Sequence, residues 1–536
     1  MDNSNRLSDT SLAKHQQISK KFKINYNNIR ELLYEKVKDR VDETFLICPG
    51  ENTIEFTYVE LKSLIKNTYN IFRGLELKNR DRISLIFHNS PEFLILYFSA
   101  LCFGLTVVPI NPNIASQEMR YIINDSKSKV IFYSNTLEFK IKNIKNLDNV
   151  KLEKITSIND QEFSLKSENS FEENEISIHD TAVIIYTSGT SGNPKGAILS
   201  HLNLLSKSKS ISEWFHFDTK TRTLCILPLD HVAWQITNLL APLYQGGSTV
   251  IVQEKVSLLY FWDLVNKYDV TWTSGMASIL PILLSRSKER KDQTLKAILC
   301  GGQILTRTVQ KQFEERFKIP IFDGYGLAET TGFVCINCFP AEKRRIGSIG
   351  KVLPTNEMTI LDENSKDVGE NNVGEICMRG YNVTSGYLGL KEKNEKSFRD
   401  GWFHSGDFGW KDSDGFFYFQ GRKDFLIIKG GENIYPAELE NVLYQHPDII
   451  ECAVIGIPHK LLGEDMCAFV KCKEESEVSE IELKGFCKNN IGSYKQPQKI
   501  VIINLLDDLD DIPKGPTKKI LYRELKKYYM ENLSDN

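Results

Sequence analysis

An apolar run that leads directly into a glycine-rich loop constrains the fold most strongly. The run AVIIY at 182–186 consists of β-branched, apolar and aromatic residues, which is typical of a strand buried on both faces. The loop TSGTSGNPKG at 187–196 follows it without a spacer. This order predicts an anion-binding turn at the end of a buried strand, with a flexible surface turn as the alternative.

The loop supplies the groups that a phosphate needs. Its glycines let the backbone approach a ligand closely and turn N–H groups inward. Its hydroxyls add donors, and its lysine adds a point charge suited to phosphate. No GK[ST] follows, so the loop is not a Walker A loop. The candidate phosphate-binding residues are Thr187, Ser188, Gly189, Thr190, Ser191, Gly192 and Lys195.

Helical and strand patterns alternate along the first three hundred residues or so. Such alternation predicts parallel strands joined by crossover helices. The segment 140–178 has weak periodicity and is expected to be surface connection. Helices are expected at 61–75 and 93–103, and strands at 83–87, 106–111, 128–134, 182–186, 224–229, 248–252, 297–300 and 319–326.

The sequence pattern changes after residue 345. Short strand-like runs separated by glycine turns (GSIGKVL, EMTILDE, GEICMRG and GFFYFQG) predict a small, mostly β subdomain. A compact α/β unit is expected from about 425 to 536, with a helix at 436–444 that has Pro436 in its first turn.

Composition excludes several classes of protein. A chain of 536 residues is too long for one core, and its net charge of −3 gives no general attraction to nucleic acid. The most apolar segment, Phe93–Val108, is too short to span a membrane. Eleven cysteines without regular spacing favour reduced thiols, and the Cys335–Cys338 pair has no second pair to complete a metal site. We expect a cytoplasmic enzyme with no nucleic acid partner and no membrane span.

Five motifs resemble, in order, those of the adenylate-forming superfamily, which includes acyl-CoA synthetases, peptide-synthetase adenylation domains and firefly-type luciferases. They correspond to its phosphate loop, adenine-and-magnesium motif, ribose-binding segment, hinge and C-terminal lysine motif. The resemblance covers nearly the whole chain. The motifs are YTSGTSGNPKG at 186–196, GYGLAET at 324–330, GWFHSGD at 401–407, GRKD at 421–424 and PKGPTKKI at 513–520.

The resemblance implies a fold and a domain division. The expected fold class is α/β, with a large N-terminal domain of layered α/β subdomains and a small β subdomain, followed by a small mobile C-terminal α+β domain. Residues 1–423 would form the AMP-binding domain with the ATP and acyl pockets. Residues 424–536 would form the C-terminal domain, which rotates about a hinge near Asp424.

The resemblance also assigns nucleotide-binding roles. Asp323, Gly324 and Tyr325 would border adenine, with Tyr325 flat against the ring. Glu329, beside Thr330, would hold the Mg²⁺ that arrives with ATP. Asp407 could accept both ribose hydroxyls, and Arg422 could donate to the sugar or a phosphate. A packed core aromatic, a helix N-terminal carboxylate and a surface salt bridge are the structural alternatives.

Two further segments would contact the reacting groups. Lys519 matches the lysine that closes over the α-phosphate during adenylation, although the family usually has glycine where this chain has Lys518. Lys519 is preferred because Ile520 and Leu521 then fall in register. Gly430 and Gly431 match the loop that borders the pantetheine tunnel, with a tight turn as an equal competitor.

The acyl pocket is defined less sharply. His231 falls where the family has an aromatic residue or histidine, and Gly302 and Gln303 lie at a strand end that borders both acyl group and adenine. Position 324 lacks the arginine of dicarboxylate-using members, so a malonate-like substrate is not expected. Asp230, shifted by one position, resembles the group that pairs with an amino-acid ammonium. A neutral aliphatic or aromatic acid is favoured over an amino acid.

The implied activity is that of an AMP-forming acid–thiol ligase that uses ATP and Mg²⁺. A carboxylic acid is adenylated, and the acyl group then passes to coenzyme A. The alternative acceptor is the phosphopantetheine arm of an acyl or peptidyl carrier protein. A catalytically inactive scaffold would be expected to lose Lys195, Glu329, Asp407 or Lys519, and all are present. No feature selects a luciferase-like oxygenase.

Overall fold

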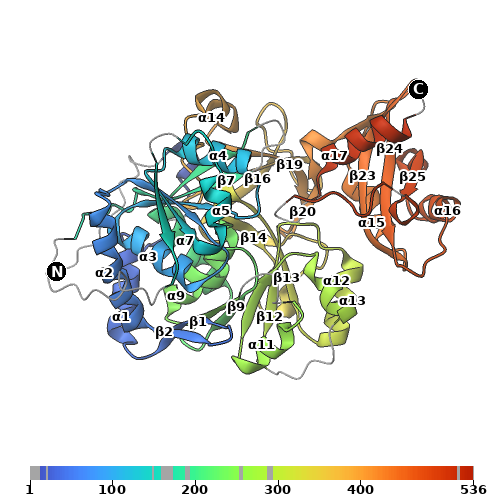
Figure 1. Cartoon of the computed structure of the whole chain (residues 1–536). Helices are drawn as coiled ribbons and strands as arrows, with labels where there is room; N and C mark the ends of the chain where they lie inside the picture. Colours follow the sequence, from blue (N-terminus) through green and yellow to red (C-terminus); the bar gives the residue numbers. More distant parts are fainter. Residues whose placement is uncertain are drawn as a thin grey trace.

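The computed structural model describes most of the chain and contains two large sheets, a small sheet and a separate C-terminal sheet (Figure 1). The described residues are 13–19, 22–147, 150–157, 173–187, 193–252, 258–286, 294–506, 508–515 and 520–534.

The first large sheet has six strands in the order β6-β5-β3-β4-β7-β8. Its first five strands are parallel, and β8 returns antiparallel to β7. The predicted phosphate loop therefore joins two strands of a hairpin. The strands are β3 (Arg82–Ile86), β4 (Thr106–Ile110), β5 (Val130–Ser134), β6 (Lys151–Ile155), β7 (Thr181–Thr187) and β8 (Lys195–Ser200).

The second large sheet has nine strands in the order β15-β14-β13-β12-β11-β9-β10-β1-β2. The six central strands, from β13 to β1, are parallel, and antiparallel strands flank them at both sides. The strands are β1 (Thr44–Cys48), β2 (Ile54–Thr57), β9 (Arg222–Cys225), β10 (Ser248–Ile251), β11 (Trp272–Gly275), β12 (Ala297–Cys300), β13 (Ile321–Leu327), β14 (Gly332–Ile336) and β15 (Lys351–Val352).

Helices fill the space between these two sheets. The main apolar core joins inward-facing residues of both sheets to the helices between them, and a second cluster covers the outer face of the first sheet. The helices of this part are α1 (Ile29–Asp39), α2 (Tyr58–Gly74), α3 (Pro91–Phe103), α4 (Ser116–Ser126), α5 (Glu138–Lys142), α7 (His201–Trp214), α8 (Val232–Trp234), the π-helix Gln235–Leu240, α9 (Ala241–Gln245), α11 (Phe261–Lys267), α12 (Ile279–Arg286) and α13 (Arg307–Phe317).

Helix α3 explains the most apolar segment of the sequence. Ser90 caps its N-terminus, Pro91 occupies its first turn, and Gly104 ends it in the left-handed conformation. Every residue from Phe93 to Phe103 is buried, because the helix packs within the core on all sides. Within the described residues, no helix combines the length and apolarity needed to cross a membrane.

The small sheet and the C-terminal unit complete the chain. The small sheet contains β16 (Asn356–Leu361), β17 (Gly374–Gly380), β18 (Phe398–Arg399), β19 (Trp402–Lys411) and β20 (Phe417–Arg422), with α14 (Lys391–Ser397) beside it. The C-terminal unit, in orange and red in Figure 1, contains β21 (Ile427–Lys429), β22 (Glu432–Ile434), β23 (Ile449–His459), β24 (Gly463–Cys472), β25 (Lys499–Ile502), α15 (Pro436–Leu443), α16 (Glu480–Asn490) and α17 (Tyr522–Tyr528).

The α/β fold class and nearly all predicted elements are confirmed, and two predictions are wrong. Strand β6 lies inside the segment 140–178, where only surface connection was expected; three of its five residues are exposed, so it has little apolar signal. Strand β15 pairs with β14 and extends the nine-stranded sheet instead of the small one. All eleven cysteines are free thiols, as expected.

A substitution at Gly326 tests the packing of the β13–β14 hairpin. A Cβ atom there would lie 2.0 Å from the carbonyl oxygen of Gly332, which is backbone and cannot rotate away. Gly326→Ala should therefore lower the free energy of unfolding by about 1–3 kcal/mol. The measurement is urea unfolding followed by tryptophan fluorescence, since all six tryptophans lie between residues 214 and 410.

Gly74→Ala is the matched control. Gly74 lies in the last turn of α2, and its Cβ would meet no atom within 4 Å. Alanine at this position should be neutral or raise stability by up to about 1 kcal/mol. Equal stability of the two variants would contradict the close approach of β13 and β14.

Candidate active site

Tyr325 lies at the centre of the candidate site, near the carboxyl end of β13. The residue is 9% exposed, and its ring stacks on Phe419, with ring centroids 6.0 Å apart. Its hydroxyl donates a 2.6 Å hydrogen bond to the Asp407 carboxylate. Burial, and then the Asp407 charge, raises the pKa of Tyr325, so the hydroxyl keeps its proton and acts as the donor.

Asp407 connects three of the sequence motifs. Its side chain is only 4% exposed, and its second oxygen lies 3.2 Å from Arg422 Nε. Asp407 and Arg422 are also register partners on β19 and β20. The adenine, ribose and hinge motifs, which are about a hundred residues apart at the extremes, therefore meet around one carboxylate.

Glu329 is held in a 3-10 turn (Ala328–Thr330) between β13 and β14. Its carboxylate accepts a 2.8 Å hydrogen bond from Tyr387 Oη, and its carbonyl accepts one of 2.7 Å from Thr384 N–H. The neighbouring Thr330 hydroxyl donates to Gly332 O at 2.8 Å. Tyr387 was not identified from the sequence, because no local pattern connects it to a residue 58 positions earlier.

Lys195 begins β8 and shares an electrostatic environment with the motifs above. Burial lowers the pKa of Lys195, and the charges of Lys393 and Arg422 lower it further. The carboxylates of Glu329 and Asp424 act in the opposite direction. A lysine in a positive, partly buried setting favours an anion beside it, since an anion restores the charged form.

His231 is held at the N-terminus of α8 by a buried polar network. Asn89 accepts from Leu229 N–H at 2.9 Å, and Gln235 donates to Leu229 O at 2.7 Å. Helix α8, whose N-cap is His231, packs against β14 of the β13–β14 hairpin. Asp230 accepts a 3.3 Å hydrogen bond from Asn111, and His231 Nε2 lies 4.0 Å from its carboxylate. Asp230 therefore already has a protein partner.

The remaining predicted residues lie at three places. Asp323 and Gly324 occupy β13, where burial raises the pKa of Asp323 well above its usual value. Gly302 and Gln303 follow β12, and Gln303 accepts from Ser278 N–H at 3.1 Å. Gly430 and Gly431 form the turn between β21 and β22, and the Gly430 N–H donates to Leu462 O in the same unit.

Part of the predicted site lies outside the described residues. Thr187 is the last residue of β7, and its hydroxyl lies 3.5 Å from Lys195 O. Residues 188–192 of the loop between them and the two C-terminal lysines lie outside the described residues, so this holds for Ser188, Gly189, Thr190, Ser191, Gly192, Lys518 and Lys519.

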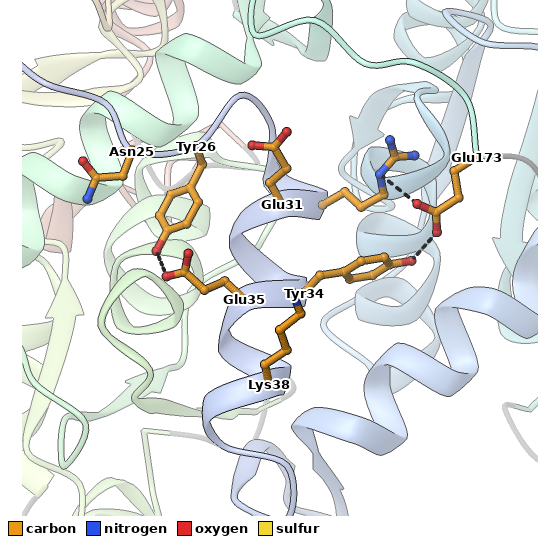
Figure 2. Close-up of a pocket in the computed structure, with 8 residues that line it drawn as sticks. Asn25, Tyr26, Glu31, Tyr34, Glu35, Lys38 and Glu173 are labelled. Carbon is orange, nitrogen blue, oxygen red and sulfur yellow. Dashed lines mark hydrogen bonds and ion pairs between the residues drawn. The ribbon is translucent and has the colours of Figure 1, made fainter. Parts of the chain in front are cut away.

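A depression of about 410 Å³ lies on the surface of α1, and none of the motif residues lines it (Figure 2). Its polar groups interact with one another: Tyr26 donates to Glu35, and both Arg30 and Tyr34 contact Glu173. Because these partners satisfy each other, the depression offers little to an ATP-sized anion, and the motif residues remain the candidate active site.

Two family models match the chain. Residues 33–388 match the AMP-binding enzyme family, and residues 438–510 match the AMP-binding enzyme C-terminal domain. The chain is 31% identical to an oxalate–CoA ligase of Arabidopsis thaliana, with 93% of this chain and 98% of that one covered. It is 29% identical to a crotonobetaine/carnitine–CoA ligase of Salmonella typhimurium, with coverage of 93% and 99%.

Solved structures agree with these matches. MatB from Rhodopseudomonas palustris with ATP bound superposes with a TM-score of 0.87 at 25% identity, covering 95% of this chain and all of that one. The o-succinylbenzoate CoA synthetase of Bacillus subtilis, in complex with its acyl-adenylate, gives a TM-score of 0.81 at 27% identity, with coverage of 94% and 98%.

Removing the Tyr325 hydroxyl tests the central contact. Tyr325→Phe should lower the free energy of unfolding by about 1–3 kcal/mol, because the buried Asp407 carboxylate loses its shortest hydrogen bond. Urea unfolding measures the change.

Tyr418→Phe, on strand β20 of the small sheet that also holds Asp407, is the control. The Tyr418 hydroxyl donates to Asp412, which keeps its bonds from Phe416 N–H and Arg345. Its loss should cost less than about 0.5 kcal/mol. If the two variants lose the same stability, the Tyr325–Asp407 contact is not a buried, stabilising bond.

Proposed function

The chain belongs to the AMP-binding enzyme family, and from this premise we propose that it is an AMP-forming ligase that joins a carboxylic acid to coenzyme A. The acid carboxylate attacks the α-phosphate of ATP and pyrophosphate leaves. The thiolate of coenzyme A then attacks the acyl carbon and AMP leaves. Binding and charge stabilisation drive both steps, and no side-chain nucleophile is needed.

The buried contact between Tyr325 and Asp407 supports this function best. An aromatic face beside a carboxylate that accepts hydrogen bonds fits the adenine and the two ribose hydroxyls of ATP. Asp407 presents acceptor oxygens only, and Arg422 beside it can donate to the sugar or the α-phosphate.

The phosphates would bind on the side of the site that holds Lys195. We propose that the loop residues 188–192 and Lys195 cradle them, and that Glu329 holds the Mg²⁺ carried by ATP. When bound, Mg²⁺ neutralises phosphate charge. The hydrogen bond from Tyr387 fixes the orientation of Glu329 so that its other oxygen can serve the metal.

The C-terminal unit would complete the reaction. We propose a division into residues 1–423 and 424–536, with the hinge near Asp424, where the small sheet ends and the C-terminal sheet begins. Lys519 would approach the reacting carboxylate during adenylation. After rotation, Gly430 and Gly431 would border the pantetheine arm, whose passage needs a slim loop.

We propose a neutral aliphatic or aromatic acid as the substrate, bound beside His231, Gly302 and Gln303. Gly324 provides no cation for a second carboxylate, which speaks against a malonate-like acid. Asp230 already pairs with Asn111, which weakens the case for an amino acid. A carrier-protein acceptor is not favoured, since the relatives named above are CoA ligases. We place the reaction in the cytoplasm.

The experiment is a substrate panel. Purified protein is incubated with Mg–ATP and fatty, aryl, dicarboxylic and amino acids, and pyrophosphate release is measured with and without coenzyme A. Acid-dependent release, with AMP and a thioester formed only when coenzyme A is present, is the expected result. Adenylate that coenzyme A cannot discharge would replace coenzyme A by a carrier protein, and ADP as the product would overturn the function.

The adjacent lysines provide a matched pair of variants. Lys519→Ala should slow adenylation by about 10²- to 10³-fold, because the ammonium no longer offsets charge in the transition state. Lys518→Ala should stay within about threefold of the wild type, since a neighbouring side chain has no such role. Single-turnover pyrophosphate release measures both. The reverse order would assign the role to Lys518.

A further inference from the structure

Asp407 lies in a bulge of β19, and the bulge determines where its carboxylate points. Glu375 pairs with Phe408, and Cys377 pairs with His404. One residue of β17 therefore stands opposite three residues of β19, Ser405 to Asp407. An insertion of this kind bends a strand and redirects its side chains, and such bulges are frequent beside active sites.

Two groups on β17 hold the bulge in shape. The Gly406 N–H, which the ladder leaves without a strand partner, donates to Glu375 Oε1 at 2.9 Å. The Ser405 hydroxyl donates to Ile376 O at 2.6 Å and accepts from Asp407 N–H at 3.0 Å. Gly406 has a φ of +75°, a conformation that glycine adopts without strain. The carboxylate of Glu375 thus takes the place of a missing backbone acceptor.

Glu375 is itself fixed from the other side. Its second oxygen accepts from His404 Nδ1 at 2.9 Å and lies 3.5 Å from Arg399. The Glu375 side chain is 13% exposed and that of His404 is 2% exposed. Although burial opposes it, the hydrogen bond from His404 holds the pKa of Glu375 below its usual value. The carboxylate therefore stays ionised and cannot rotate away without breaking contacts on both oxygens.

The same residues, with Cys377, could in principle hold a metal ion, since their ligand atoms lie within 4.8 Å of one another. The observed contacts favour hydrogen bonding instead. His404 Nδ1 and Glu375 Oε2 are at hydrogen-bond distance, and the other carboxylate oxygen is already engaged by Gly406. Burial raises the pKa of Cys377, which favours the thiol over the thiolate that a metal would need.

We propose that Glu375 is a positioning residue for nucleotide recognition: through the Gly406 N–H it aims Asp407 at the ribose, and His404 keeps Glu375 in place. The inference rests on the proposed ribose role of Asp407. It predicts that loss of Glu375 weakens the recognition of the ribose hydroxyls by Asp407, which Glu375 does not touch. Binding of the acid should be unchanged.

The test compares ATP with 2′-deoxy-ATP and 3′-deoxy-ATP as substrates in pyrophosphate release. The kcat/KM of the wild type should be about 10- to 100-fold higher for ATP than for either deoxy analogue, because each analogue lacks a hydrogen bond to a charged group. Glu375→Ala should reduce this preference to within about threefold while the KM for the acid stays unchanged. Glu375→Gln keeps an acceptor for the Gly406 N–H and should restore most of the preference.

Cys377→Ala is the control, because Cys377 touches His404 but not the bulge. It should keep the full preference for ATP. The phenylalanine of His404→Phe fills the histidine's site but cannot donate a hydrogen bond to Glu375, so this variant should lose part of the preference for ATP. If Glu375→Ala does not fold, His404→Phe serves as the test in its place.

Three outcomes distinguish the ribose role of Asp407, the positioning role of Glu375 and a metal site. An active wild type without any preference for ATP would refute the ribose role of Asp407. A wild type with the preference, together with a folded Glu375→Ala or His404→Phe that keeps it, would overturn the positioning role alone. Stoichiometric zinc in the purified wild type that is lost in Cys377→Ala would replace the hydrogen-bonded cluster with a metal site.

Discussion

The buried carboxylate of Asp407 is the constraint around which the candidate site is built. A carboxylate with a 4% exposed side chain needs partners, since an unpaired buried charge is strongly unfavourable. Its partners come from β13 of the nine-stranded sheet and β20 of the small sheet. The contacts of this one group therefore connect the small sheet to the large one, beside the apolar cluster that the two sheets share. The same contact brings together the aromatic face of Tyr325, the two carboxylate oxygens of Asp407 and the guanidinium of Arg422.

Contacts behind the site hold its residues in place. The bulge of β19 directs Asp407, and Glu375 fills the gap that the bulge leaves in the strand ladder. On the other side, Tyr387 and the backbone of Thr384 hold Glu329. Segment 381–387 is itself anchored, because buried Asn203 donates to Tyr381 O and Val383 O. Each contacting group is thus supported by a polar contact behind it, as a preorganised site requires.

Most sheets and helices could be predicted from the sequence, whereas the hydrogen bonds that support the site could not. Helix α3 and strands β3, β4 and β7 were predictable because their burial is recorded in continuous apolar runs. Strand β6 was not, because an exposed edge strand needs no apolar residues. Tyr325 and Asp407 were found through local motifs. Glu375, His404 and Tyr387 were missed because they act through long-range hydrogen bonds, which leave no pattern in a single sequence.

A crystal structure of the protein with AMP bound measures the central relation directly, namely the position of the ribose relative to Asp407. The expected result is that both ribose hydroxyls lie within hydrogen-bond distance of the Asp407 carboxylate, with adenine against Tyr325 and the Gly406–Glu375 bond intact. AMP bound elsewhere, or a ribose facing solvent while the Tyr325–Asp407 bond remains closed, would contradict the assignment of this carboxylate as the nucleotide-binding group.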